Sequence, residues 1–235
     1  PLHSAAVAYQ GQGILLPGGS SSGKTTLALE LATSGFDYLS DEYAPIDLDR
    51  LMVWPFPRPL QASGQATEIL LGTRQKEIVK GQPFADDNGN PRYLINPKEI
   101  ASIGQACPVG YVLLPVIQHG HKPGLRSLSK VETLGELAHL MLVFRSDLIW
   151  KRRAVEALVA LVRRAACYRL FLGQIGANGA LVRALLGDTP KGGVEVESEA
   201  DDVMSLDRVS EQVKVLLLRS TEERDETWIP KRQTI

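Results

Sequence analysis

The chain has 235 residues, and 44% of them are hydrophobic, which is enough for one α/β domain with a sizeable core. Lysine and arginine number 26 and aspartate and glutamate 27, so the formal net charge is -1, and aromatic residues make up only 6%. This composition provides neither a basic stripe that follows a phosphate backbone nor a stacking platform for bases. We therefore expect no nucleic-acid partner.

Cysteine content and hydropathy point to a reducing compartment and away from the membrane. The two cysteines, Cys107 and Cys167, lie far apart and show no metal-ligand spacing, so neither a disulfide framework nor a zinc site is expected. The longest apolar run, residues 109–117, is interrupted by Pro115 and is much shorter than the ~20 residues of a membrane helix. No signal peptide is recognisable. These features predict a cytoplasmic protein with no membrane partner.

The N-terminal segment predicts a β-hairpin. Two short apolar runs, residues 5–9 and 13–16, are separated by the polar, glycine-containing segment 10–12. The second run leads directly into a loop rich in glycine and serine, residues 18–23. Such a loop after an apolar strand is typical of a backbone turn that approaches a ligand closely.

A helix is expected over residues 24–34, because apolar residues recur there at helical spacing and a glycine at position 35 supplies a stop signal. A short strand over residues 36–39 follows and ends at Asp41-Glu42. Strand, helix and strand in this order are typical of a βαβ unit with parallel strands. We therefore expect the glycine-rich loop and the acidic pair at the same edge of one sheet.

The remaining elements complete an α/β prediction with a mixed sheet and flanking helices. Strands are expected near residues 44–46, 51–53, 109–117, 125–128 and 168–172, helices from 130, after 150 and over 176–186, and turn-rich segments at 54–64 and 85–91. Residues 1–187 are predicted to form the domain, and residues 188–235 a mobile acidic linker and C-terminal tail.

The glycine-rich loop matches the phosphate-binding pattern G-x-x-x-x-G-K-[ST]. In such a P-loop the backbone N–H groups converge on a phosphate, and the N-terminus of the following helix adds positive potential. Lys24 is expected to reach the β and γ phosphates, and the Thr25 hydroxyl to bind a bridging Mg²⁺. A chance match is the alternative, but the strand before the loop and the helix after it favour ATP or GTP binding. The residues expected to bind the nucleotide are Gly18, Gly19, Ser20, Ser21, Ser22, Gly23, Lys24, Thr25 and Thr26.

Asp41 and Glu42 can supply the second half of such a site. Phosphoryl transfer to an alcohol needs a carboxylate for Mg²⁺ and benefits from a base near the acceptor hydroxyl. Neighbouring side chains at a strand end point in different directions, so one carboxylate can face the metal and the other the substrate. The alternative is an acidic pair on the surface with no chemical role.

These residues together resemble the catalytic core of HPr kinase/phosphorylase and of related kinases that share its fold with ATP-dependent phosphoenolpyruvate carboxykinase. That family has a histidine 21 positions before the P-loop lysine, as His3 is before Lys24, and an acidic pair 17 and 18 positions after it, as Asp41 and Glu42 are. The resemblance covers the chain to about Arg58. It implies an α/β fold with the P-loop core of that type.

The resemblance implies an enzyme that transfers the γ-phosphoryl group of ATP to a serine hydroxyl of a protein or peptide. Glu42 would be the base, where the family has aspartate, and Asp41 would bind Mg²⁺ together with Thr25. His3 would lie near the transferred phosphoryl group. The family's further Mg²⁺-binding glutamate is not recognisable here, and Glu68 is only a positional match. The family often forms rings, which leaves a homo-oligomer open.

For several residues, and for the whole protein, the sequence also allows a second interpretation. Arg58 lies in a Pro-Phe-Pro-Arg-Pro segment typical of short HPr kinase-like proteins, and it would either clamp a phosphate or form a surface ion pair. His3 by itself would more often be a solvated residue. His119 and His121 lack the two further ligands of a metal site, which favours a solvated turn. For the whole protein, the alternatives are a small-molecule hydroxyl kinase and a non-catalytic nucleotide switch.

Overall fold

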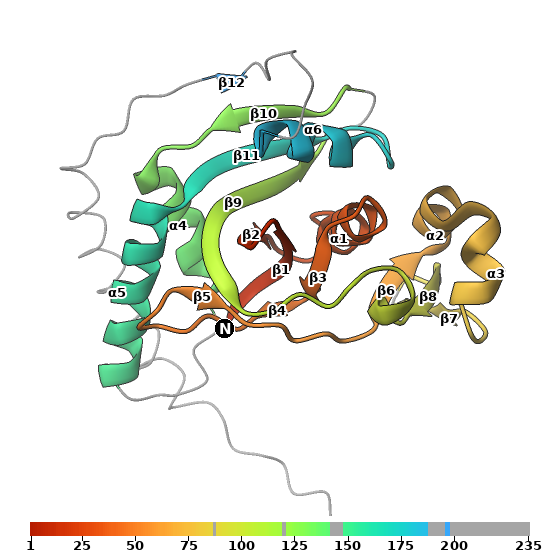
Figure 1. Cartoon of the computed structure of the whole chain (residues 1–235), viewed down its shortest axis with the longest axis horizontal. Helices are drawn as coiled ribbons and strands as arrows, with labels where there is room; N and C mark the ends of the chain where they lie inside the picture. Colours follow the sequence, from red (N-terminus) through yellow and green to blue (C-terminus); the bar gives the residue numbers. More distant parts are fainter. Residues whose placement is uncertain (87, 119–120, 142–147, 188–195, 198–235) are drawn as a thin grey trace, which may run out of the picture.

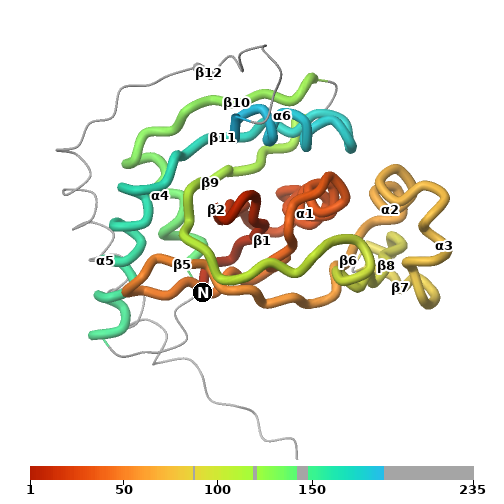
Figure 2. The backbone as a smooth tube through the Cα atoms, viewed as in Figure 1, coloured from red at the N-terminus to blue at the C-terminus, as the bar shows by residue number. Residues whose placement is uncertain are grey.

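The computed structural model describes residues 1–86, 88–118, 121–141, 148–187 and 196–197. A large mixed sheet lies between two layers of helices, and a small second sheet with its own helices stands beside it (Figures 1 and 2). The expected α/β architecture with a mixed sheet and flanking helices is therefore confirmed. None of the described helices has the length and apolar character that a membrane-spanning helix requires.

The main sheet has the strand order β12-β10-β11-β9-β2-β1-β3, with β4 paired to β1 and β5 to β9. Its strands are β1 (Leu2–Tyr9), β2 (Gln12–Pro17), β3 (Asp37–Ser40), β4 (Tyr43–Ala44), β5 (Met52–Val53), β9 (Cys107–Ile117), β10 (Gly124–Ser127), β11 (Ala166–Leu172) and β12 (Val196–Glu197). Strands β2, β9 and β11 are parallel, whereas β1 is antiparallel to both of its neighbours, β2 and β3. The expected strands at 44–46, 51–53, 109–117, 125–128 and 168–172 are present with shifted ends.

The predicted hairpin and the helix after the glycine-rich loop are confirmed as β1, β2 and α1 (Lys24–Thr33). The predicted βαβ unit needs a correction, because β1 lies between β2 and β3. The tight turn at Gln10 and Gly11, with φ of 49° and 77°, folds β1 back against β2, and β3 pairs with the other edge of β1 while β9 pairs with the other edge of β2. Strands β2 and β3 still run in the same direction. Their carboxyl ends therefore reach the same edge of the sheet, as the sequence predicted.

The two faces of the main sheet pack against different helices. One face, which includes Ala6 and Ala8 of β1, forms a core with α4 (Lys130–Leu140) and α5 (Leu148–Arg164). The opposite face, which includes Ala5 and Val7, forms a second core with α1 and α6 (Asn178–Leu185). The alternation along β1 is the period-2 pattern of a strand buried on both faces. Helix α1 is thus fixed on the sheet, and its N-terminus carries the glycine-rich loop.

The small sheet has the order β6-β8-β7 and packs beside α1. It consists of β6 (Leu60–Ser63), β7 (Phe84–Ala85) and β8 (Pro91–Ile95), with helices α2 (Gly64–Leu71) and α3 (Gln75–Ile78) and short 3-10 turns at Gly72–Arg74 and Pro97–Glu99. Turn-rich segments were expected at 54–64 and 85–91, so the strand β6 corrects the first of these. Strands of two to five residues are too short to give a clear alternating pattern.

The expected helices from residue 130, after residue 150 and near 176–186 correspond to α4, α5 and α6. The predicted linker and tail, residues 188–235, lie outside the described residues except for Val196–Glu197. These two residues form β12, which pairs in parallel with β10. His119 of the expected histidine-containing loop also lies outside the described part of the chain.

A buried carboxylate ties α1 to α6 and gives a first prediction. Glu30 of α1 is only 1% exposed, and its oxygens accept hydrogen bonds from the Asn178 side chain (2.8 Å) and the Gly179 N–H (2.7 Å), at the start of α6. Glu30→Gln replaces one acceptor by a donor and removes the charge. Because hydrogen bonds to a charged group are worth about 1.5–3 kcal/mol, we expect the free energy of unfolding to fall by about 2 kcal/mol or more. Urea unfolding measures this.

The matched control is Glu156→Gln on α5, where the side chain is 49% exposed and pairs with Arg152. Surface substitutions of this kind change the free energy of unfolding by about 0.5 kcal/mol or less. Equal losses in the two variants would show that the link between α1 and α6 adds nothing beyond an ordinary surface contact.

Candidate functional site

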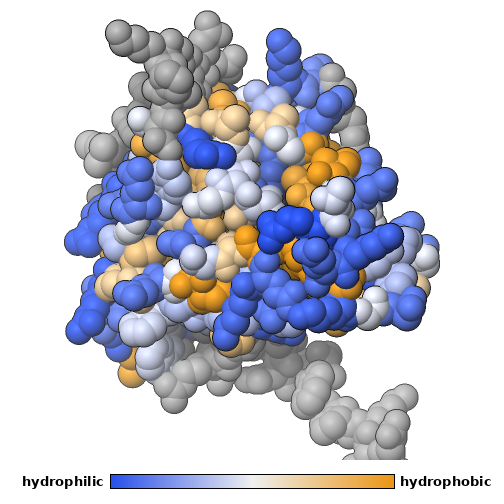
Figure 3. All heavy atoms as spheres, turned by 45° about the vertical axis from the view of Figure 1, so that its right-hand side comes forward, coloured by the Kyte–Doolittle hydropathy of each residue, from blue (hydrophilic) through white to orange (hydrophobic). Residues whose placement is uncertain are grey.

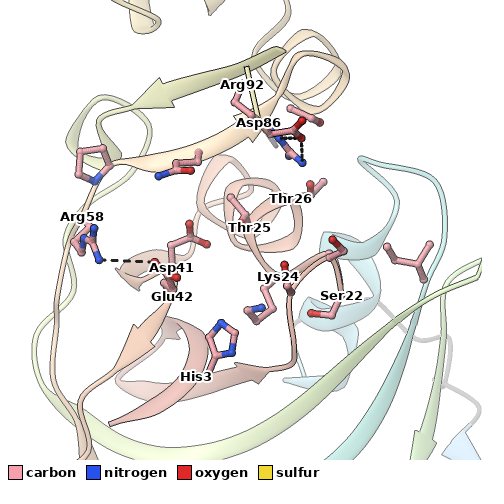
Figure 4. A pocket seen from close by; sticks show the side chains of 17 residues that line it. His3, Ser22, Lys24, Thr25, Thr26, Asp41, Glu42, Arg58, Asp86 and Arg92 are labelled. Carbon is pink, nitrogen blue, oxygen red and sulfur yellow. Dashed lines mark hydrogen bonds and ion pairs between the residues drawn. The ribbon is translucent and has the colours of Figure 1, made fainter. Parts of the chain in front are cut away.

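A cavity of 590 Å³ opens at the carboxyl edge of β2 and β3 and faces the small sheet (Figure 4). This volume lies within the roughly 300–1,000 Å³ that small-molecule sites occupy. Among the residues predicted as functional, those that line the cavity are His3, Ser20, Ser21, Ser22, Gly23, Lys24, Thr25, Thr26, Asp41, Glu42 and Arg58. Positions far apart in the sequence, from 3 to 58, are thus brought to one site.

The glycine-rich loop has a backbone that only particular residues allow. Gly23 has φ of 89°, and a Cβ atom there would lie 2.7 Å from the Leu172 side chain. Ser21 also has a positive φ, 62°. Gly18 and Gly19, which were also predicted to bind the nucleotide, do not line the cavity. Gly18 donates its N–H to the His3 carbonyl at 3.4 Å and so joins the loop to β1. The loop therefore has a fixed, tight shape at the N-terminus of α1.

Lys24 lies inside this loop. Its side chain is among the buried charged groups, at 7% exposure, and Nζ donates a hydrogen bond to the carbonyl of Gly19 at 2.6 Å. Burial lowers the pKa of Lys24, while the nearby carboxylates Asp41 and Glu42 act in the opposite direction. The ammonium group is therefore held between the loop and the acidic pair.

Asp41 follows the last residue of β3 and is the more buried member of the acidic pair. Burial raises the pKa of its carboxyl group from 3.8 to about 6, although a hydrogen bond with Thr25 and the charge of Lys24 oppose this rise. Within the described part of the chain, its Oδ1 atom is buried and has no hydrogen-bond partner. A buried carboxylate oxygen without a partner is costly unless a cation or a donor binds there. The hydroxyl oxygen of Ser22 in the loop is buried and unpartnered in the same way.

Glu42 has a different environment from its neighbour. Its side chain is 52% exposed and forms an ion pair with Arg58, 53% exposed, at an Nη1–Oε2 distance of 3.7 Å. The backbone of Arg58 is positioned from β3, because the Tyr38 hydroxyl donates to the Arg58 carbonyl at 3.2 Å. Asp41 is thus enclosed, whereas Glu42 and Arg58 face the open part of the cavity.

His3 approaches the cavity from β1, the strand between those that carry the loop and the acidic pair. It pairs with Tyr43 of β4. Burial lowers the pKa of His3, the charge of Lys24 lowers it further, and Glu42 partly offsets both. The lowered pKa favours the neutral imidazole, in which one nitrogen is a donor and the other an acceptor.

The residues at this site fit a magnesium ion bound together with phosphates. In the described ranges, no cluster of three or more His, Cys, Asp or Glu side chains stands ready to hold a metal alone. Magnesium in phosphate-binding sites commonly uses one or two protein ligands, with waters and phosphate oxygens completing the shell. The Thr25 hydroxyl and the unpartnered oxygen of Asp41 supply such a pair.

Sequence reasoning missed the far wall of the cavity, which comes from the small sheet. This wall consists of Pro59, Gln61, Ser63, Asp86 and Arg92, with Ile117 at the end of β9. The sequence predicts residues 85–91 only as a turn. Asp86 within it accepts the backbone hydrogen bonds that a turn of this composition predicts, but nothing in the sequence places it at the cavity. Glu68, the positional match for a further metal ligand, does not line the cavity.

The side of the molecule that carries the small sheet is largely hydrophilic, with separate hydrophobic patches (Figure 3). Ile69, Phe84 and Leu94 are exposed hydrophobic residues of the small-sheet segment.

Comparison with models of known protein families gave no match, and a search of curated proteins gave none either. The assignment of function therefore depends on the geometry and chemistry of the cavity.

Proposed function

We propose that the protein is an ATP- and Mg²⁺-dependent kinase that transfers the γ-phosphoryl group to a serine hydroxyl of a protein or peptide, on a P-loop core of the HPr kinase and phosphoenolpyruvate carboxykinase type. The observation that carries the proposal is the pairing of two unlike carboxylates beside the glycine-rich loop. Asp41 is buried with an unpartnered oxygen, and Glu42 is half exposed in the same cavity. One is suited to a metal and the other to a proton.

The loop and Lys24 would bind the triphosphate. Residues 20–26, the loop and the first turn of α1, line the cavity, and the helix dipole favours negative charge at this N-terminus. Lys24 would exchange its hydrogen bond with the Gly19 carbonyl for one with a phosphate oxygen. Thr25 and Asp41 would hold Mg²⁺, which, when bound, neutralises charge on the β and γ phosphates.

Transfer itself would take place on the side of Glu42. The serine oxygen forms a bond to the γ-phosphorus as the bond to the leaving oxygen of ADP breaks, and the serine proton passes to the Glu42 carboxylate. Arg58, already paired with Glu42, would turn its guanidinium toward the transferred phosphoryl group. The neutral His3 would donate a hydrogen bond to an oxygen of that group.

The first test is incubation of the purified protein with γ-labelled ATP, Mg²⁺ and a lysate of its own source. We expect label on a protein or peptide serine with the wild type, and no label with Lys24→Ala, because the loop then lacks its mobile cation. Lys76→Ala is the matched control, since Lys76 is exposed on α3 and does not line the cavity.

Label on a small-molecule alcohol would instead identify the protein as a small-molecule hydroxyl kinase, and the roles proposed for the residues would be unchanged. Tight ATP binding with no labelled product in any fraction would contradict the kinase and would leave a nucleotide-dependent switch.

A further inference from the structure

The far wall of the cavity contains an ordered arginine that the transfer chemistry does not use. Asp86 accepts backbone hydrogen bonds from Asn88 (3.0 Å) and Asn90 (2.9 Å) through one oxygen, which shapes the turn between β7 and β8. Its other oxygen accepts from Nε of Arg92 at 3.0 Å and lies 3.0 Å from Nη2. The guanidinium plane of Arg92 is therefore oriented at the cavity wall before any ligand binds.

The pair lies at a different end of the cavity from the proposed transfer centre. In Figure 4, Asp86 and Arg92 lie on the side of Thr26, whereas His3, Asp41 and Glu42 surround Lys24. A triphosphate bound with its γ-phosphate beside Lys24 and its α-phosphate beside Thr26 would continue from there toward Arg92. The group that follows the α-phosphate in ATP is the nucleoside.

The chemistry of this wall suits a nucleoside better than a further phosphate. In the part of the chain described here, Nη1 of Arg92 donates no hydrogen bond, and the Asp86 carboxylate beside it would repel an additional anion. An arginine held flat by a carboxylate can stack on a heteroaromatic ring. Gln61, on the neighbouring strand β6, adds an amide that can pair with the edge of a base.

We propose that Arg92, oriented by Asp86, binds the base of the nucleotide, with Gln61 beside it. This inference rests on the proposed function, because it takes the glycine-rich loop as the phosphate site. It assigns the small sheet a role in recognising the nucleoside, separate from the chemistry at the acidic pair.

The test compares the dissociation constants of Mg-ATP and of Mg-tripolyphosphate, which has the phosphates but no nucleoside, by isothermal titration calorimetry. For Arg92→Ala we expect about a 10-fold weaker affinity for ATP and an affinity for tripolyphosphate within twofold of the wild type. Arg92→Lys is expected to behave like Arg92→Ala, because lysine keeps the charge but lacks the planar group. Arg152→Ala on α5, which removes an arginine outside the cavity, is the matched control and should change neither value.

Equal weakening for ATP and tripolyphosphate in Arg92→Ala would assign Arg92 to the phosphates and overturn the inference. Unchanged affinity for both ligands would overturn it as well. If the wild type binds neither ligand, the proposed nucleotide site itself fails, and this result is distinct from the other two. Gln61→Ala provides a second variant that leaves the turn and its ion pair intact, with a selective loss of ATP affinity as the expected result.

Discussion

Substitution of Glu42 by glutamine is expected to slow phosphoryl transfer to serine by 100-fold or more, with the affinity for ATP within about threefold of the wild type. The amide keeps the size of the side chain but cannot accept a proton, and a positioned base contributes roughly 10²–10⁴ to such rates. Because the side chain at position 42 is half exposed, replacing its carboxylate by an amide should leave the buried part of the site intact. Single-turnover rates and the dissociation constant of Mg-ATP measure the two effects separately.

Two controls sharpen this experiment. Glu42→Asp keeps a carboxylate and should retain more activity than the glutamine variant, because only the reach of the base changes. Glu68→Gln removes an exposed carboxylate that does not line the cavity and should have no effect. A rate for Glu42→Gln close to that of the wild type would exclude Glu42 as the base.

Asp41→Asn is expected to make the protein more stable and to remove Mg²⁺-dependent transfer. Since burial raises the pKa of Asp41 from 3.8 to about 6, its ionised form is disfavoured in the folded state at neutral pH. A rise of this size corresponds to roughly 3 kcal/mol at most, so we expect a gain in the free energy of unfolding of about 1–3 kcal/mol at pH 7.5 without metal. Transfer should fall at least 100-fold, because the amide is a poor ligand for Mg²⁺.

The pH dependence follows from the same shift. Between about pH 4 and 6 the folded protein binds more protons at Asp41 than the unfolded chain does, so this group lowers stability as pH rises through that window. The asparagine variant lacks this contribution. Urea unfolding at pH 4.5 and 7.5 should therefore show a gap between variant and wild type that is much larger at pH 7.5. A variant less stable than the wild type at pH 7.5 would contradict the assignment.

The sequence predicted the parts of the site that local rules specify. The glycine-rich loop lies between an apolar strand and a helix, and Asp41 and Glu42 follow the next strand. Predicting that the loop and the acidic pair meet at one edge therefore required only the direction of the strands. The order of those strands was not predictable in the same way. Strand β1 lies between β2 and β3 because of a tertiary pairing, and a hairpin pattern does not specify which free edge a later strand will join.

The small sheet and its place at the cavity could not be predicted from local sequence patterns either. Its strands are held by pairing across long sequence distances, as between Leu60 and Ile95, and by burial of both residues. In the sequence, nothing distinguishes Arg92 from other charged residues beside a turn. Only the folded chain shows that Asp86 orients it toward the same cavity as Lys24.

The position of β2 within the main sheet has a consequence for the cost of binding. Both edges of β2 are paired, to β1 and to β9, and the loop that follows it is held by hydrogen bonds from the Gly18 N–H to the His3 carbonyl and from the Ser22 N–H to the Gly19 carbonyl. In the proposed kinase, a phosphate would therefore meet backbone amides that are already held in place, and little of its binding energy would be spent on ordering them. The opposite wall depends on strands of two to five residues. The cavity thus combines a floor on the central strands of the main sheet with a wall whose turn and arginine are held by Asp86.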